Sequence, residues 1–174
     1  MIGSGGSTLH ILHSLKMKYG AEMEKMRTLV IHAGGYSKRL PSHSCSGKIF
    51  SPLPIAALDG GLYQMLDLKL AMYRPFLAMM EPGGVFITAS DDIEVFTMED
   101  TEGLDTSLTA GETVTALAHP SSLFIGTTHG VYVMEEKEVG VETLQDVRPC
   151  LEVLQKPSVE LMRERGAVIK SGDG

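Results

Sequence analysis

Short apolar runs alternate with amphipathic stretches along the first half of the chain. Residues 28–31 (TLVI) and 84–90 (GVFITAS) are apolar and rich in β-formers, a pattern typical of buried parallel strands. Between them, apolar residues at helical spacing in residues 60–73 predict a helix that Pro75 closes. The apolar positions of that helix are Leu62, Leu66, Leu70 and Tyr73. This order of strand, helix and strand favours an α/β sheet.

A glycine-rich segment, residues 3–6, comes before the first predicted helix. We expect this segment to form a loop, with Ser7 or Thr8 as the helix cap and Gly20 as the stop. The apolar stripe of this helix comprises Leu9, Leu12, Leu15 and Tyr19. In α/β proteins such a loop usually leaves a strand, and Met1 stands where that strand is expected.

The second half of the chain is predicted to be rich in strands. Four short segments favour β-structure: residues 114–119, 122–126, 130–134 and 151–156. A capped helix is expected from Ser158 to about Arg165, with Gly166 as its stop. The pattern therefore predicts an antiparallel addition to the α/β sheet. Residues 167–174 resemble a strand and a turn that lead onward, so both ends suggest a piece of a longer fold.

Charge and composition narrow the function classes. A net charge of −7 over 174 residues opposes a general nucleic-acid surface or an anionic membrane surface. Two cysteines are too few for a disulfide framework, which predicts a cytoplasmic location. No apolar stretch approaches the ~20 residues that a membrane helix needs.

The charges are segregated along the chain. Residues 28–58 contain no Asp or Glu, whereas residues 75–136 contain no Lys or Arg and eleven of the 22 acidic residues. This segregation is consistent with an anion pocket beside a cation-binding face, or with ordinary solvated surfaces.

The segment HAGGYSKRLPSHSCSGK, residues 32–48, is the strongest candidate for chemistry. It is neither a Walker A loop nor a dinucleotide fingerprint, because the glycines and the residue after Lys48 do not match those patterns. Gly34 and Gly35 allow backbone N–H groups to approach a phosphate closely. Arg39 and Lys48 can neutralise a triphosphate chain.

This segment resembles the signature of sugar-phosphate nucleotidyltransferases, G-G-x-x-x-R-L followed by a lysine. Further blocks are similar to the fucose-1-phosphate guanylyltransferase (GDP-L-fucose pyrophosphorylase) family: IGSGGSTL, YQMLDLKLAMY, ASDDIEVF, TALAHPSSLFIGTTHGVYV and LQKPSVE. The resemblance implies a Rossmann-like nucleotidyltransferase sheet with helices on both faces. It also implies one partial domain over residues 1–174, without the family's C-terminal β-helical region.

The resemblance implies a reaction in which GTP and L-fucose 1-phosphate give GDP-L-fucose and pyrophosphate, with Mg²⁺ as the cofactor. Arg39 and Lys48 match the loop cations of the family and are expected to hold the β- and γ-phosphates; surface charge beside a turn is the alternative. The glycines expected to bring backbone against the nucleotide are Gly34, Gly35, Gly5 and Gly6.

The resemblance places the remaining site residues after predicted strands. Asp92, or alternatively Asp91, is expected to bind magnesium, which needs only one or two carboxylates beside phosphate oxygens. Lys156 matches a lysine-proline element that contacts the sugar-linked phosphate. His119 and His129 either bind fucose hydroxyls or stabilise loops, and the sequence does not separate these roles.

Two other hypotheses stay open at this point. The chain is either a working guanylyltransferase or a truncated, weakly active nucleotide-binding piece of one, because the later acidic segment of the superfamily has no counterpart. The chemistry is also compatible with another sugar 1-phosphate, since no residue in the loop selects fucose or guanine.

Overall fold

The computed structural model describes residues 3–34, 41–58, 60–90, 92–94, 114–135 and 148–169. The chain forms two compact units, Met1–Thr115 and Ala116–Gly174, and each is described by itself. The described residues form helices and three two-stranded sheets, one parallel and two antiparallel. This mixed architecture agrees with the predicted incomplete α/β fold, while the single domain over residues 1–174 stays a prediction.

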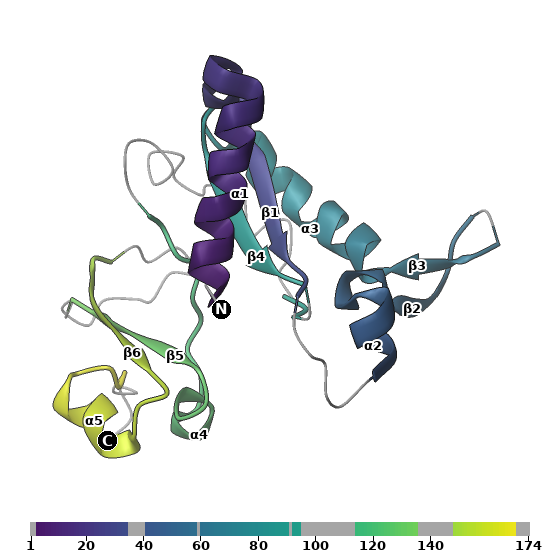
Figure 1. The fold of residues 1–174 in the computed structure, drawn as a ribbon. Coiled ribbons are helices and arrows are strands. Elements are labelled where there is room, and N and C mark those ends of the chain that lie inside the picture. The colour runs from purple at the N-terminus through teal and green to yellow at the C-terminus, as the bar shows by residue number, and fades with distance from the viewer. Residues whose placement is uncertain are drawn as a thin grey trace. The chain divides into compact units, whose positions relative to one another are not determined.

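The parallel pair predicted in the first unit is present. Strand β1 (Thr28–His32) lies parallel to β4 (Val85–Ala89), with Thr28 opposite Val85 and His32 opposite Ala89. Helix α3 (Met65–Met79) lies between them in sequence and packs against β4 (Figure 1). The strand, helix, strand order read from the hydrophobic pattern is therefore confirmed.

Helix α3 begins later than predicted. Leu62 lies in strand β3 (Leu62–Gln64) and not in the helix. The helix begins at Met65 because Gln64 and Asp67 form a capping box, in which each side chain accepts a hydrogen bond from the other residue's backbone N–H. This local arrangement satisfies two backbone donors that the first turn leaves unpaired.

Helix α3 also ends later than predicted, because Pro75 lies inside it. Proline removes one intrahelical hydrogen bond, but Phe76 stacks on Phe86 of β4 with ring centroids 5.9 Å apart. This packing stabilises the last turn. The buried positions of the helix are Met65, Lys69 and Tyr73, whereas Leu70 is exposed.

The predicted glycine-rich loop is instead the start of helix α1 (Gly3–Tyr19). Ser7 donates a side-chain hydrogen bond to the Gly3 carbonyl oxygen (2.9 Å), and Thr8 donates one to the Ser4 carbonyl oxygen (3.1 Å). Glycine costs a helix only about 1 kcal/mol relative to alanine, and these contacts support the helical conformation. A 3₁₀ helix, η1 (Gly20–Lys25), follows. The predicted stripe is partly wrong, since Leu9 and Tyr19 are exposed.

Helices α1 and α3 pack on opposite faces of the parallel pair (Figure 1). Tyr73 of α3 meets Phe86 edge to face, with ring centroids 5.0 Å apart. Thr8 of α1 contacts the ring of His32 (2.8 Å), which lies opposite Ala89. Ala89 and Phe86 are three residues apart on β4, so their side chains point to opposite faces. This arrangement agrees with helices on both sides of the sheet.

The segment between β1 and α3 forms a short antiparallel hairpin. It contains helix α2 (Pro41–Ser46), the 3₁₀ helix η2 (Lys48–Phe50), strand β2 (Pro52–Ala56) and β3, which pairs with β2. Pro52 and Pro54 lie in the extended chain of β2, whereas Pro41 begins α2. Proline is well suited to the first position of a helix, where its missing N–H has no intrahelical partner anyway.

The second unit is a hairpin with two short helices. Strand β5 (Gly130–Met134) pairs antiparallel with β6 (Cys150–Gln155), which confirms both predicted strands. Among the described residues they form a sheet of their own and not the predicted addition to the parallel pair. Helix α5 (Val159–Glu164) is capped by Ser158 and followed by Gly166 at φ +71°, which also confirms the prediction.

Two predicted strands of this region are wrong. Residues 122–126 hold helix α4 (Leu123–Gly126), because Ser122 caps it by accepting a hydrogen bond from the backbone of Ile125. Residues 114–119 have no regular secondary structure, and neither do residues 167–169. Residues 170–174 lie outside the described part of the chain.

Candidate functional site

The carboxyl ends of β1 and β4 bring separate segments to one edge of the parallel pair. The backbone N–H of Ser90, directly after β4, donates to the carbonyl oxygen of His32, the last residue of β1 (3.1 Å). Gly34 follows β1 by two residues, and Asp92 follows β4 by three. Open α/β sheets bind ligands at this edge, so the predicted loop glycine and the predicted acid lie where such a site is expected.

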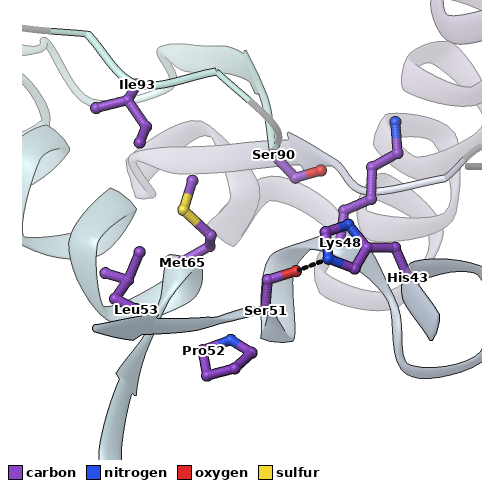
Figure 2. Close-up of a pocket in the computed structure, with 8 residues that line it drawn as sticks. All are labelled: His43, Lys48, Ser51, Pro52, Leu53, Met65, Ser90 and Ile93. Carbon is purple, nitrogen blue, oxygen red and sulfur yellow. Dashed lines mark hydrogen bonds between the residues drawn. The ribbon is translucent and has the colours of Figure 1, made fainter. Parts of the chain in front are cut away.

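A pocket of about 190 Å³ opens beside this edge (Figure 2). Its lining residues are His43, Lys48, Ser51, Pro52, Leu53, Met65, Ser90 and Ile93. In Figure 2, the apolar side chains of Leu53, Met65 and Ile93 lie on one side and the basic side chains of Lys48 and His43 on the other. Such a pocket is suited to a ligand with an anionic group and a less polar ring.

The polar side of the pocket is partly organised by hydrogen bonding. Ser51 and the Nε2 atom of His43 lie 3.0 Å apart and share a hydrogen bond. Lys48 begins η2, and Gly47 before it has φ +84°, a conformation that glycine adopts without strain. The turn at Gly47 therefore helps to place the predicted phosphate-binding lysine on the pocket wall.

Ser90 lines the pocket, and its hydroxyl has no hydrogen bond within the part of the chain that the structure describes. The residue is 0% exposed, and its Oγ atom has no partner among the described residues. An unpaired buried hydroxyl costs about 1–3 kcal/mol. Ser90 is thus a polar group at the carboxyl edge of β4 that retains its full hydrogen-bonding capacity.

A buried lysine connects helix α3 to two acids that follow β4, Asp92 and Glu94. Lys69 is 0% exposed. Its Nζ atom lies 2.5 Å from Asp92 Oδ1 and 2.9 Å from Glu94 Oε2, and it donates to the hydroxyl of Tyr73 at 2.9 Å. The Tyr73 hydroxyl also contacts Glu94 (2.5 Å) and Thr88 (2.6 Å). These five side chains form one network that joins α3, β4 and residues 92–94.

The network stabilises the charged forms of Lys69 and Glu94 and the neutral form of Tyr73. Burial lowers the pKa of Lys69, but hydrogen bonds to Asp92, Tyr73 and Glu94 outweigh burial and raise that pKa above its ordinary value. Burial raises the pKa of Glu94, but hydrogen bonds from Tyr73 and Lys69 leave it below 4.5. Burial and the bond to Glu94 raise the pKa of Tyr73. At neutral pH Lys69 is therefore a cation, Glu94 a carboxylate and Tyr73 a neutral phenol.

Asp92 fits a single-carboxylate role in magnesium binding. Its side chain is 53% exposed, and Lys69 contacts only one of its two oxygens. No cluster of three or more His, Cys, Asp or Glu suited to a metal occurs among the described residues. Magnesium commonly takes one or two carboxylates and completes its shell with water and phosphate oxygens, so the chemistry of Asp92 is sufficient for one protein ligand.

The structure gathers only part of the predicted site. Lys48, Gly34 and Asp92 lie at or near the carboxyl edge of the parallel pair, and the predictions for Arg39, Gly35 and Asp91 fall outside the described residues. Gly5 and Gly6 belong to the first turns of α1 and not to a loop. The contact of Thr8 with His32 brings these turns to the end of β1.

Lys156 and the two candidate histidines belong to the second unit. Lys156 follows β6 with φ +49°, a left-handed conformation that is uncommon for a residue with a side chain. Its backbone N–H donates to the carbonyl oxygen of His129 (3.0 Å). The Nδ1 atom of His129 lies 2.9 Å from the Thr128 hydroxyl, and that of His119 lies 3.0 Å from the Pro120 carbonyl oxygen. These local contacts favour the loop-stabilising role for both histidines.

Sequence reasoning missed Lys69, Ser90 and His43. The sequence did offer a signal for a buried Lys69: this lysine lies among apolar residues of a predicted helix, four residues before Tyr73 and so on the same helical face. No comparable signal marked Ser90, because a serine at the end of a strand is common in turns.

The fold and the site define an α/β protein with a pocket of apolar and basic walls at the carboxyl edge of its parallel strands. The chain belongs to the fucose pyrophosphorylase domain family, whose model matches residues 20–174. The described helices include none with the length and apolar character that crossing a membrane requires.

The names of curated relatives agree with this family. The chain is 45% identical over 172 residues to human fucose-1-phosphate guanylyltransferase, covering 99% of this chain and 27% of that protein. It is 32% identical over 195 aligned positions to a bifunctional fucokinase/GDP-fucose pyrophosphorylase of Arabidopsis thaliana, covering 98% of this chain and 18% of that protein. The chain thus spans about a quarter or less of the length of these relatives. No solved structure matched it.

Proposed function

We propose that this chain contributes to guanylyl transfer from GTP to L-fucose 1-phosphate, which gives GDP-L-fucose and pyrophosphate. The observation that supports the proposal is a pocket at the carboxyl edge of β1 and β4 that Lys48 lines together with Ser90 and Ile93. Ser90 and Ile93 lie on either side of Asp92 in the chain, so an acid of opposite charge follows β4 close to this pocket wall. Membership of the family supplies the identity of the substrates.

In this mechanism a phosphate oxygen of L-fucose 1-phosphate attacks the α-phosphorus of GTP. The new P–O bond forms as the bond from the α-phosphorus to the bridging oxygen breaks, and pyrophosphate leaves with that electron pair. The nucleophile is already an anion, so alignment and charge compensation are the main requirements.

Each residue has a defined role in this proposal. Lys48 compensates the charge of the β- and γ-phosphates, and the backbone beside Gly34 approaches the nucleotide. Asp92 would hold Mg²⁺, which supplies charge neutralisation of the phosphate oxygens when bound. Arg39 has the same role as Lys48, and Lys156 binds the sugar-linked phosphate. A cytoplasmic location is part of the proposal, supported by the two exposed free cysteines.

The test is an assay with GTP, L-fucose 1-phosphate and Mg²⁺ that quantifies GDP-L-fucose by chromatography. Lys48→Ala is expected to lower the rate ~10²-fold or more, as losses of transition-state contacts commonly do. The matched control is Lys25→Ala, whose side chain is 72% exposed and pairs with Glu22. An unchanged rate in Lys48→Ala would remove this lysine from the site.

A panel of substrates separates the proposal from its alternatives. Binding of GTP without product would identify a nucleotide-binding chain without turnover. Faster transfer to mannose 1-phosphate or from another nucleotide would change the substrate assignment and keep the chemistry.

A further inference from the structure

Lys69 is the most completely buried charged side chain among the described residues. It pairs with both acids of residues 92–94. An ammonium group has three N–H donors, and the structure gives Nζ three partners: Asp92 Oδ1, Glu94 Oε2 and the Tyr73 hydroxyl. Its donors are therefore all in use and none of its surface is exposed. Lys69 cannot bind a phosphate directly, unlike a lysine on the pocket wall.

The contact with Asp92 leaves that carboxylate half-exposed. Lys69 meets Oδ1, while 53% of the Asp92 side chain remains accessible. Glu94, the other carboxylate held by Lys69, is less exposed at 37% and also bonds to Tyr73. The two acids are thus not equivalent: Glu94 belongs to the interior of the network, and Asp92 lies at its outer end.

Residues 92–94 have no regular secondary structure. Among the described residues, the last backbone hydrogen bond that ties this part of the chain to the sheet is the one from Ser90 to His32. Beyond it, the bonds from Lys69 connect residues 92 and 94 to a rigid helix 23 and 25 residues earlier in the chain. Side chains that orient a metal ligand from behind are a general requirement of precise metal sites.

We propose that Lys69 is a positioning residue: it holds Asp92 through Oδ1 and so directs the other oxygen, Oδ2, toward a divalent cation at the edge of the pocket. This inference rests on the proposed function, in which Asp92 binds the metal.

The test measures metal binding and not turnover. Free Mn²⁺, used as the paramagnetic substitute for Mg²⁺, is titrated in the presence of GTP and followed by electron paramagnetic resonance. Lys69→Met removes the charge and keeps an unbranched apolar side chain. It is expected to weaken Mn²⁺ binding by about 10- to 100-fold, the usual effect of losing a group that orients a metal ligand.

Lys69→Arg separates positioning from charge compensation and keeps the test valid if Lys69→Met does not fold. The guanidinium retains the charge, but its fork binds a carboxylate through both oxygens. Lys69→Arg is therefore expected to fold, with a melting temperature near that of wild type, and to bind Mn²⁺ at least 10-fold more weakly. Wild-type Mn²⁺ affinity in Lys69→Arg would show that Lys69 supplies only charge, and would overturn the inference. Lys25→Met is the control for loss of a surface lysine.

Asp92→Asn distinguishes failure of this inference from failure of the proposed function. If Asp92→Asn weakens Mn²⁺ binding and both Lys69 variants do not, Asp92 is the metal ligand and the inference about Lys69 is wrong. If Asp92→Asn has no effect, or if wild type does not bind Mn²⁺ with GTP, the metal role of Asp92 fails and the positioning role fails with it. Glu94→Gln alters the network but keeps the Lys69 contact with Asp92. It is expected to leave Mn²⁺ affinity within about 3-fold of wild type, which corresponds to a change in binding free energy of roughly 0.7 kcal/mol or less.

Discussion

Ser90→Ala is expected to stabilise the unit Met1–Thr115, although it removes a polar group from the candidate site. Ser90 is completely buried, and its hydroxyl has no partner among the described residues. Its backbone N–H bonds to the His32 carbonyl oxygen, and alanine keeps that bond. The substitution therefore removes an unsatisfied group and leaves the strand pairing intact.

The magnitude follows from two opposing terms. An unsatisfied buried hydroxyl costs about 1–3 kcal/mol. Deleting one oxygen also leaves a small space, and deleting even a whole methylene from a core costs only about 0.5–1.5 kcal/mol. The net expectation is a gain of about 1 kcal/mol in the free energy of unfolding, or roughly 4 °C in melting temperature for a unit of this size.

Urea unfolding followed by far-ultraviolet circular dichroism measures this gain. Ser51→Ala is the matched control, because it removes the other pocket serine, whose hydroxyl shares a hydrogen bond with His43. That control is expected to lose about 1 kcal/mol. Destabilisation by Ser90→Ala of more than about 0.5 kcal/mol would refute the reasoning, since it would mean that the hydroxyl has a partner such as bound water.

Two further predictions concern acid stability and the second unit. The pKa of Glu94 is lowered on folding, so this group stabilises the native state above pH 4.5 and loses that contribution as pH falls through its folded pKa. Glu94→Gln is therefore expected to flatten the decline in melting temperature as pH falls below 4.5, and an unchanged decline would exclude Glu94 as its cause. Met162 is 2% exposed, so Met162→Ala is expected to cost about 2–5 kcal/mol in urea unfolding, against less than about 0.5 kcal/mol for the control Met17→Ala, which is 74% exposed.

The sequence alone determined the elements that depend on local patterns. Strands β1 and β4 were predictable because each is a short β-rich run with a glycine pair at one end, after β1 and before β4. Helix α5 was predictable because Ser158 and Gly166 mark its ends. The blocks that resemble a known family also indicated, correctly, the family to which the chain belongs.

Sequence composition was misleading where one or two side-chain hydrogen bonds decide between a helix and a loop or strand. Residues 3–6 are rich in glycine, yet they are helical, and the hydroxyls of Ser7 and Thr8 bond back to the preceding turn. Residues 122–126 are apolar enough for a strand, but the Ser122 cap starts a helical turn. In both cases the energy of a single side-chain hydrogen bond, about 1 kcal/mol, is comparable to the difference in intrinsic propensity between the helix and the alternative conformation.

Only the tertiary structure decided the chemistry around Asp92. Hydrophobic periodicity placed Leu70 on the inner face of α3, whereas the buried residue is its neighbour Lys69. The burial of a lysine depends on Asp92 and Glu94, which lie more than twenty residues away in the chain. A charge can leave water only when such partners replace its hydration, and the partners of Lys69 come together only after α3 packs against β4.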